Sequence, residues 1–286
     1  MSHYTVAVIT DDIKKIDDML KPYSENLEVE PYISQTKEEL LAEAKERKER
    51  FEKELKEKGL DYKEDKFKRR YIEAKTDEEL FKVNIEEMYE GDLFDENNNL
   101  LTTYNPNSKW DWYDIGGRWH NMLLVKADNN DIIGGNASWA NIESNSKKAP
   151  EGYKWCDGAR IKDIDFEKIK EIDDNPEEYI RFWETYVEGQ EPKTEKEKEA
   201  IKWEIHKKEY YIERYKTKEN YAKIQSTFHT YACLDEKGWN AKGEMGWFAC
   251  DDSTKESEEL YLEKFTELLK APENQDKYLV IVDFHI

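Results

Sequence analysis

The stretch "YLVIVDFHI" (residues 278–286) is a continuous run of β-favouring apolar residues, which predicts a buried strand. The stretch "HYTVAVIT" (residues 3–10) alternates and is rich in β-branched residues, so it predicts a second strand at the other end of the chain. A helix is predicted after the first strand and another before the last. This order predicts an α+β fold with an antiparallel, ferredoxin-like sheet, in which the terminal strands are neighbours and close the sheet.

Two helical blocks interrupt this framework, at about residues 36–90 and 160–224. In the first, the capping boxes "TKEE" and "TDEE" start helices that end before glycines. In the second, residues 194–223 form the longest helical candidate, with apolar residues at three- and four-residue spacing. Turn residues at 91–155 predict a meander, and "STFHTYACL" and "EMGWFAC" predict two later strands. We expect a single domain, residues 1–286, with these charged helices inserted.

The composition restricts the classes of partner. The chain of 286 residues carries 66 acidic and 45 basic side chains, a net charge of −21. Such a field repels phosphate backbones and anionic membranes, so neither direct nucleic-acid binding nor membrane binding is expected. No signal peptide and no membrane span is recognised. Three cysteines without metal-type spacing favour a reducing cytoplasm, with no metal site and no cofactor.

The stretch "KWDWYDIGGRW" (residues 109–119) is unusually rich in tryptophan, aspartate and glycine. In one interpretation it is a hairpin whose indoles fill the core and whose arginine pairs with a nearby aspartate. In the other it is the wall of a cleft, in which indoles stack on a ring and the arginine binds a phosphate or carboxylate. The two glycines predict a turn with positive φ. The candidate binding residues in this stretch are Trp110, Trp112, Tyr113, Arg118 and Trp119.

The two ends of the chain carry four catalytic candidates: His3, Thr5, Asp283 and His285. Antiparallel pairing of the terminal strands would place the two histidines within about 10 Å of each other. Two imidazoles can share the acid and base roles of phosphoester cleavage. His-x-Thr is half of the motif of the two-histidine phosphoesterases, which contain it twice. The second copy is incomplete, because His285 is followed only by Ile286, and this favours a non-enzymatic protein.

The predicted helix at residues 194–223 carries aromatic side chains on a charged background. Aromatic residues are enriched at the energetic centres of protein interfaces. We therefore expect one face of this helix to pack on the core or on a neighbouring subunit. The other face would offer Tyr211, with Lys207 and Glu213 nearby, to a partner.

Five stretches resemble a group of phage and prophage proteins: "MSHYTVAVI", "NPNSKWDWYDIGGRW", "ARIKDIDF", "GEMGWF" and "LVIVDFHI". Members of this group begin Met-Ser-His-Phe-Thr-Val and end Val-Asp-Cys-His-Ile. This chain has Phe284 where cysteine is usual, which argues against a required thiol at that position. The resemblance implies a phage or prophage origin and transfers no functional residue.

Two functional hypotheses follow. The first is a phage-encoded inhibitor of a bacterial defence system that acts in the host cytoplasm by protein binding, through a large interface or by DNA mimicry. Its partner would be a bacterial defence protein or complex, and the protein itself could form homo-oligomers. The alternative is a nucleotide-binding sponge or phosphodiesterase that acts on a nucleotide signal through His3, His285 and Arg118.

Overall fold

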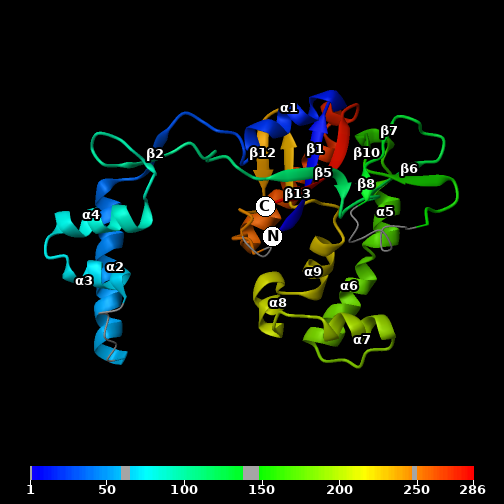
Figure 1. Ribbon diagram of the computed structural model, residues 1–286. Helices are drawn as coiled ribbons and strands as arrows, with labels where there is room; N and C mark the ends of the chain where they lie inside the picture. The colour runs from blue at the N-terminus through cyan, green and yellow to red at the C-terminus, as the bar shows by residue number, and fades with distance from the viewer. Residues whose placement is uncertain (1, 59–64, 138–147, 247–249) are drawn as a thin grey trace. The chain divides into compact units, whose positions relative to one another are not determined.

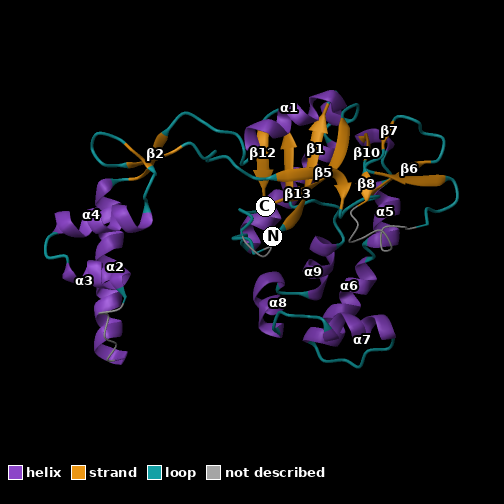
Figure 2. Ribbon diagram, in the orientation of Figure 1, coloured by secondary structure: helices purple, strands orange, loops and turns teal. Residues whose placement is uncertain are grey.

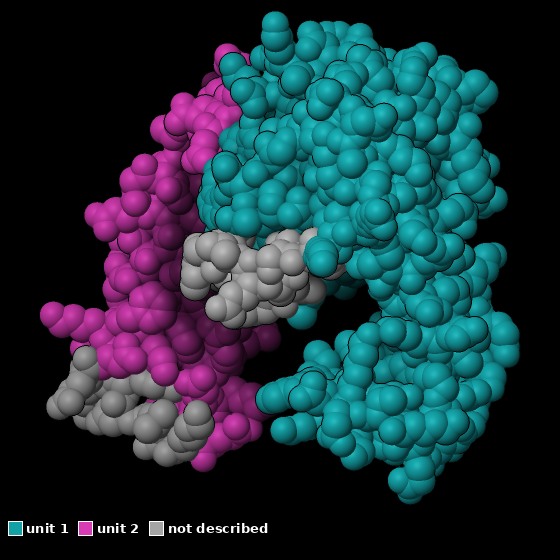
Figure 3. Space-filling model, turned by 90° about the vertical axis from the view of Figure 1, so that its right-hand side faces the viewer, with its two compact units in different colours: residues 1–25, 107–286 teal, residues 26–106 magenta. Residues whose placement is uncertain are grey.

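The computed structural model describes residues 2–58, 65–137, 148–246 and 250–286. Contacts divide the chain into two compact units, coloured separately in Figure 3. Unit 1 comprises residues 1–25 and 107–286, and unit 2 comprises residues 26–106. The predicted insertion at 36–90 lies in unit 2 and the one at 160–224 in unit 1. The expectation of a single domain stays a prediction.

The central sheet of unit 1 is built around the two terminal strands (Figure 2). Strand β1 (His3–Thr10) runs antiparallel to β13 (Tyr278–His285), with His3 opposite His285, which confirms the predicted pairing. Both strands are buried almost throughout, which explains their apolar composition. The sheet order is β12–β11–β1–β13–β10–β7, and β5 pairs with β13 and with β8. These further strands are β5 (Trp112–Gly117), β7 (Ile132–Ile133), β8 (Asn136–Ala137), β10 (Gly158–Arg160), β11 (Ala232–Asp235) and β12 (Gly238–Ala241).

The α+β class is observed, but the ferredoxin-like arrangement is not confirmed. A ferredoxin-like sheet is antiparallel throughout, whereas β1 and β11 are parallel neighbours, with Val6 opposite Ala232. The long connection between these strands contains the helical insertions, and parallel neighbours require such a crossover. The terminal strands also lie in the middle of the sheet, with a further strand on each side, rather than at a closing edge.

The hairpin that follows the second insertion is β11–β12, and its second strand differs from the prediction. We expected that strand at residues 244–250, but β12 begins at Gly238, directly after a two-residue turn. The Asp235 carboxylate accepts a hydrogen bond from the Lys237 backbone N–H (2.8 Å) and stabilises this turn. Residues 247–249 of the predicted strand lie outside the described residues.

Each face of the sheet packs against other elements (Figure 1). One face packs against α10 (Lys255–Lys270), α5 (Phe166–Asp173) and the hairpin of β6 (Leu123–Lys126) and β9 (Tyr153–Cys156). Helix α1 (Ile16–Leu20) packs against the other face. Cys156 and Cys233 are buried free thiols, and burial raises the pKa of Cys156 to about 12. These two thiols are therefore packing residues rather than nucleophiles.

The second insertion contains several short helices: α6 (Pro176–Phe182), continued by a π-helical turn (Trp183–Val187), α7 (Glu195–Lys202), α8 (Lys208–Tyr215) and α9 (Lys218–Gln225). The prediction of one helix at 194–223 was therefore wrong. Lys216 adopts a positive φ of 68° and ends α8, and the Thr217 side chain caps the next helix. The breaks allow the aromatic side chains to fold onto one another in a cluster that contains Trp183, Tyr211, Tyr215 and Tyr221.

Unit 2 contains three helices and a small sheet. Its elements are β2 (Tyr32–Gln35), α2 (Lys37–Lys58), α3 (Lys66–Glu73), α4 (Asp77–Met88), β3 (Leu93–Phe94) and β4 (Leu100–Thr102), with the strand order β2–β4–β3. The predicted capping box at the start of α2 is confirmed, because Thr36 and Glu39 bond each other's backbone N–H. Across both units, none of the described helices combines the length and apolar character needed to cross a membrane.

Candidate functional site

His3 and His285 face each other from the adjacent strands β1 and β13. Their ring centroids lie 4.8 Å apart and the ring planes meet at 71°, an edge-to-face contact. Alternation along the paired strands places Thr5 and Asp283 on the same sheet face as the histidines. The predicted proximity of the two imidazoles is thus confirmed.

Each imidazole is held by a carboxylate at Nδ1. His3 Nδ1 lies 2.8 Å from Asp283 Oδ1, and His285 Nδ1 lies 2.6 Å from Asp111 Oδ1. An ionised carboxylate can only accept a hydrogen bond, so Nδ1 is the donor in both pairs. Nε2 then carries a free lone pair in the neutral ring and an acidic N–H in the imidazolium. The site therefore offers two imidazole rings in fixed orientations, and Nε2 is the reactive atom of each.

Asp283 is only 1% exposed, and a buried carboxylate needs several donors. Its Oδ2 accepts a second hydrogen bond from the backbone N–H of Arg118 (2.9 Å). Gly117, with φ of +54°, brings this backbone close, since a Cβ at that position would overlap the Asp283 side chain. The glycine pair of the 109–119 stretch therefore positions the partner of His3.

Trp112 borders the histidine pair. Its ring stacks on His285 with centroids 4.9 Å apart and an angle of 17°, and it meets His3 edge-on at 5.3 Å. Trp112 is 42% exposed. An indole that is partly open to solvent beside two imidazoles can stack on the ring of a bound molecule.

The rest of the 109–119 stretch belongs to the core, so each of the two interpretations describes part of it. Trp110 and Tyr113 pack with Phe284 on the opposite sheet face, and Trp110 Nε1 donates to the Leu20 carbonyl (3.1 Å). In one continuous strand, Trp110 and Trp112 would share a face. They do not, because β5 begins only at Trp112. Trp119 packs against the core on the α10 side of the sheet.

Three other predicted residues make contacts that differ from those expected. The Thr5 hydroxyl accepts a hydrogen bond from the Tyr231 backbone N–H (3.2 Å), so it connects β1 to β11. Arg118 contributes its backbone to the site, while its side chain is exposed. Tyr211, which we expected to face a partner, is 6% exposed within the aromatic cluster. That expectation was wrong because the helix is broken, and the exposed large apolar residues of this region are Trp203 (74%), Ile205 (87%) and Ile212 (48%).

A further histidine–aspartate pair, which was not predicted from the sequence, lies on the other side of the glycine pair. His120 Nδ1 lies 2.7 Å from Asp157 Oδ2, and Asp157 is fully buried. The Asp157 carboxylate also accepts from the backbone N–H groups of Asn121 and Gly135, each at 2.6 Å. Asp111 was one of the two nearby aspartates, with Asp114, that were predicted to pair with Arg118. The only sequence signal for these contacts was the Gly-Gly-Arg-Trp-His turn itself.

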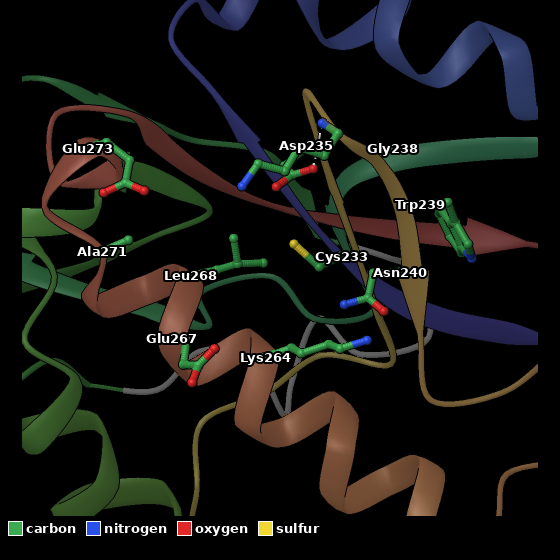
Figure 4. A pocket seen from close by; sticks show the side chains of 11 residues that line it. Cys233, Asp235, Gly238, Trp239, Asn240, Lys264, Glu267, Leu268, Ala271 and Glu273 are labelled. Carbon is green, nitrogen blue, oxygen red and sulfur yellow. Dashed lines mark hydrogen bonds between the residues drawn. The ribbon is translucent and has the colours of Figure 1, made fainter.

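In the described part of the chain, no group of three or more histidine, cysteine, aspartate or glutamate side chains could hold a metal ion. A hollow of about 430 Å³ lies beside β12 and is lined by residues of β11, β12 and α10 (Figure 4). None of its lining residues belongs to the histidine pair. The histidines remain the candidate site, because they supply oriented reactive groups.

Comparison with known proteins adds no relative: no protein-family model, no curated protein and no solved structure matches this chain.

Proposed function

We propose that the protein binds a nucleotide at the His3–His285 pair and cleaves one of its phosphoester bonds. The observation that carries this proposal is the carboxylate at Nδ1 of each imidazole. One Nε2 takes the proton of the attacking hydroxyl or water as its oxygen bonds to phosphorus. The other Nε2, protonated at the start, gives its proton to the leaving oxygen as the P–O bond breaks. The partly exposed indole of Trp112 would stack on the base.

The test is incubation of the purified protein with a panel of cyclic and linear nucleotides, with separation of products by chromatography. His3→Gln and His285→Gln should each reduce turnover by about 10²–10⁴-fold, the usual contribution of general acid–base catalysis. His206→Gln, which changes an exposed histidine between α7 and α8, is the matched control and should leave turnover unchanged. Retention of one nucleotide without turnover would assign the site to binding alone. Failure to retain or cleave any nucleotide would contradict the proposal.

We also propose that the protein is phage-encoded and inhibits a bacterial defence system in the host cytoplasm by binding one of its components. The observation that supports this second function is the exposure of Trp203 and Ile205 between α7 and α8. Large apolar side chains left in water two residues apart in the chain are typical of interfaces. The net charge of −21 favours a basic partner surface, such as one that binds DNA.

This second function is tested by co-expression with a panel of defence systems, followed by phage challenge. The double variant Trp203→Asp, Ile205→Asp should lose inhibition while its melting temperature stays that of the wild type. Leu93→Asp, which changes another exposed apolar residue, is the control and should inhibit normally. Normal inhibition by the double variant would exclude this surface, and inhibition of no system would exclude the function. Sedimentation of the same proteins tests the expected self-association.

A further inference from the structure

Strand β12 lies at an edge of the central sheet. Among the residues that the structure describes, β11 is its only strand neighbour. The Lys242 backbone N–H donates to the Tyr231 carbonyl (3.4 Å), just beyond the paired strands. Since hydrogen-bonded pairs alternate along an antiparallel ladder, Trp239 and Ala241 direct their backbone N–H and C=O groups away from β11. An edge of this kind is a template for another strand.

A groove follows this edge on the side of α10. The hollow of about 430 Å³ is lined by residues of β11 and β12 and by the C-terminal half of α10. A second hollow of about 500 Å³ is lined by residues 239–244 and by the start of α10. The two share Trp239 and Asn240, so together they follow the strand along its length. Figure 4 shows Asn240 of β12 on one side of the first hollow, with Lys264 and Leu268 of α10 on the other.

The charges that line the groove indicate what it would bind. The acidic lining residues outnumber the basic ones, and Leu268 adds apolar surface. The basic Lys242 is already near two carboxylates, those of Asp251 and Glu258. The acidic residues are Asp235, Glu244, Asp252, Glu267 and Glu273, and the basic ones are Lys237, Lys242 and Lys264. A complementary ligand is therefore basic, with apolar side chains between its charges.

We propose that β12 is the docking edge for an extended basic segment of a partner protein, which adds to the sheet as a strand beside β12 and directs alternate side chains to the α10 side. Main-chain hydrogen bonds to Trp239 and Ala241 would supply affinity, and the groove would select alternate side chains. The proposal is independent of the histidine site, because β12 is separated from β1 by β11. It is also independent of Trp203 and Ile205, which do not line the groove.

The probe is an end-blocked hexapeptide of alternating lysine and valine, added to the full-length protein at low salt. Amide chemical shifts should change at residues 238–242 and along the facing side of α10. A fully N-methylated form of the peptide should bind about tenfold more weakly or worse, since it cannot donate strand hydrogen bonds. A glutamate–valine peptide should also bind more weakly. Equal binding of the N-methylated form, or shift changes elsewhere on the protein, would overturn the proposal.

A substitution in β12 tests the same hydrogen bonds by changing the protein instead of the peptide. Ala241→Pro removes an N–H that points away from β11, a position at which an edge strand tolerates proline. It should weaken binding of the lysine–valine peptide about tenfold, whereas Ala241→Val should bind like the wild type. Equal affinities of the two folded variants would overturn the proposal. If Ala241→Pro fails to fold, the comparison with the N-methylated peptide decides.

Discussion

Two buried carboxylates lie against the same pair of glycines. Gly117 lies against Asp283, and a Cβ at Gly116 would lie 2.8 Å from Cγ of Asp157. Each carboxylate accepts from one imidazole and from backbone N–H groups of the surrounding loops. Buried ionised groups are stable only with such partners. At the residue scale, the glycine pair allows the backbone to reach both carboxylates at once.

Substitution of Gly117 separates two contributions to stability. Gly152→Ala places a side chain at φ of +78° with no atom within 4 Å of the new Cβ, so it should cost only the conformational energy, about 1–2 kcal/mol. Gly117→Ala adds overlap with the Asp283 side chain and should cost more in the free energy of unfolding, measured with urea. It should also reduce any turnover that depends on His3. Equal losses of stability in the two variants would show that Asp283 is not tightly enclosed.

The burial of His229 predicts that the free energy of unfolding of the protein depends on pH. It is partly buried, its Nδ1 lies 2.7 Å from the Thr227 carbonyl, and burial lowers its pKa. In the unfolded chain histidine titrates near ~6.5. Between that value and the lower folded pKa, the unfolded chain binds more protons, so the free energy of unfolding falls as the pH falls through this window. His229→Gln should flatten the profile below pH ~6.5, and profiles that stay parallel would contradict the assignment.

At the scale of elements, the division of residues 194–223 into several short helices decides which of their aromatic side chains are buried and which are exposed. Tyr211 lies inside the cluster of α6, α8 and α9, where burial raises its pKa, and Trp203 lies in water at the end of α7. A single amphipathic helix could not have buried so many aromatic side chains against each other. Three short helices can, because each turns its aromatic face toward the same centre.

Two substitutions test the assignment of Tyr211 to the buried cluster and of Trp203 to the surface. Tyr211→Ala should lower the free energy of unfolding by about 3–5 kcal/mol, the range for large aromatic residues in cores. Trp203→Ala should change it by no more than about 0.5 kcal/mol, as at other exposed positions. Urea denaturation of both variants measures the difference. The opposite order of effects would mean that Trp203, rather than Tyr211, belongs to the cluster.

At the scale of the whole molecule, unit 2 enters and leaves unit 1 at neighbouring points. The chain departs after residue 25 and returns at residue 107. The Glu25 N–H donates to the Trp110 carbonyl (2.8 Å), and the Lys109 N–H donates to the Tyr23 carbonyl (2.7 Å). The ends of unit 1 at this insertion point are therefore hydrogen-bonded to each other without any residue of unit 2.

Removal of unit 2 should therefore leave unit 1 folded. Replacement of residues 26–106 by a short Gly–Ser linker should preserve the amide spectrum of β1, β13 and α10 and a cooperative thermal transition. The loop that is closed becomes shorter, which lowers its entropic cost. A matched control shortens the same insertion inside unit 2 and keeps residues 26–36 and 99–106. Loss of the unit 1 spectrum only in the full deletion would show that unit 1 needs contacts from unit 2.

The sequence by itself determined the features that depend on short-range patterns. Alternation and β-branching identified β1, a continuous apolar run identified β13, and capping chemistry identified the start of α2. The proximity of His3 and His285 followed too, because antiparallel pairing of two terminal strands brings the chain ends together. Only the tertiary structure decided which carboxylate each imidazole contacts. Asp111 and His285 are 174 residues apart, and no local periodicity encodes such a pair.

The parallel pairing of β1 with β11 and the burial of Tyr211 were also decided by the tertiary structure. Both depend on how the long connections pack, and the free energy of that packing is summed over many distant contacts. A pattern of residues along the chain reports which side chains prefer burial. It does not report which of the other buried side chains they will meet.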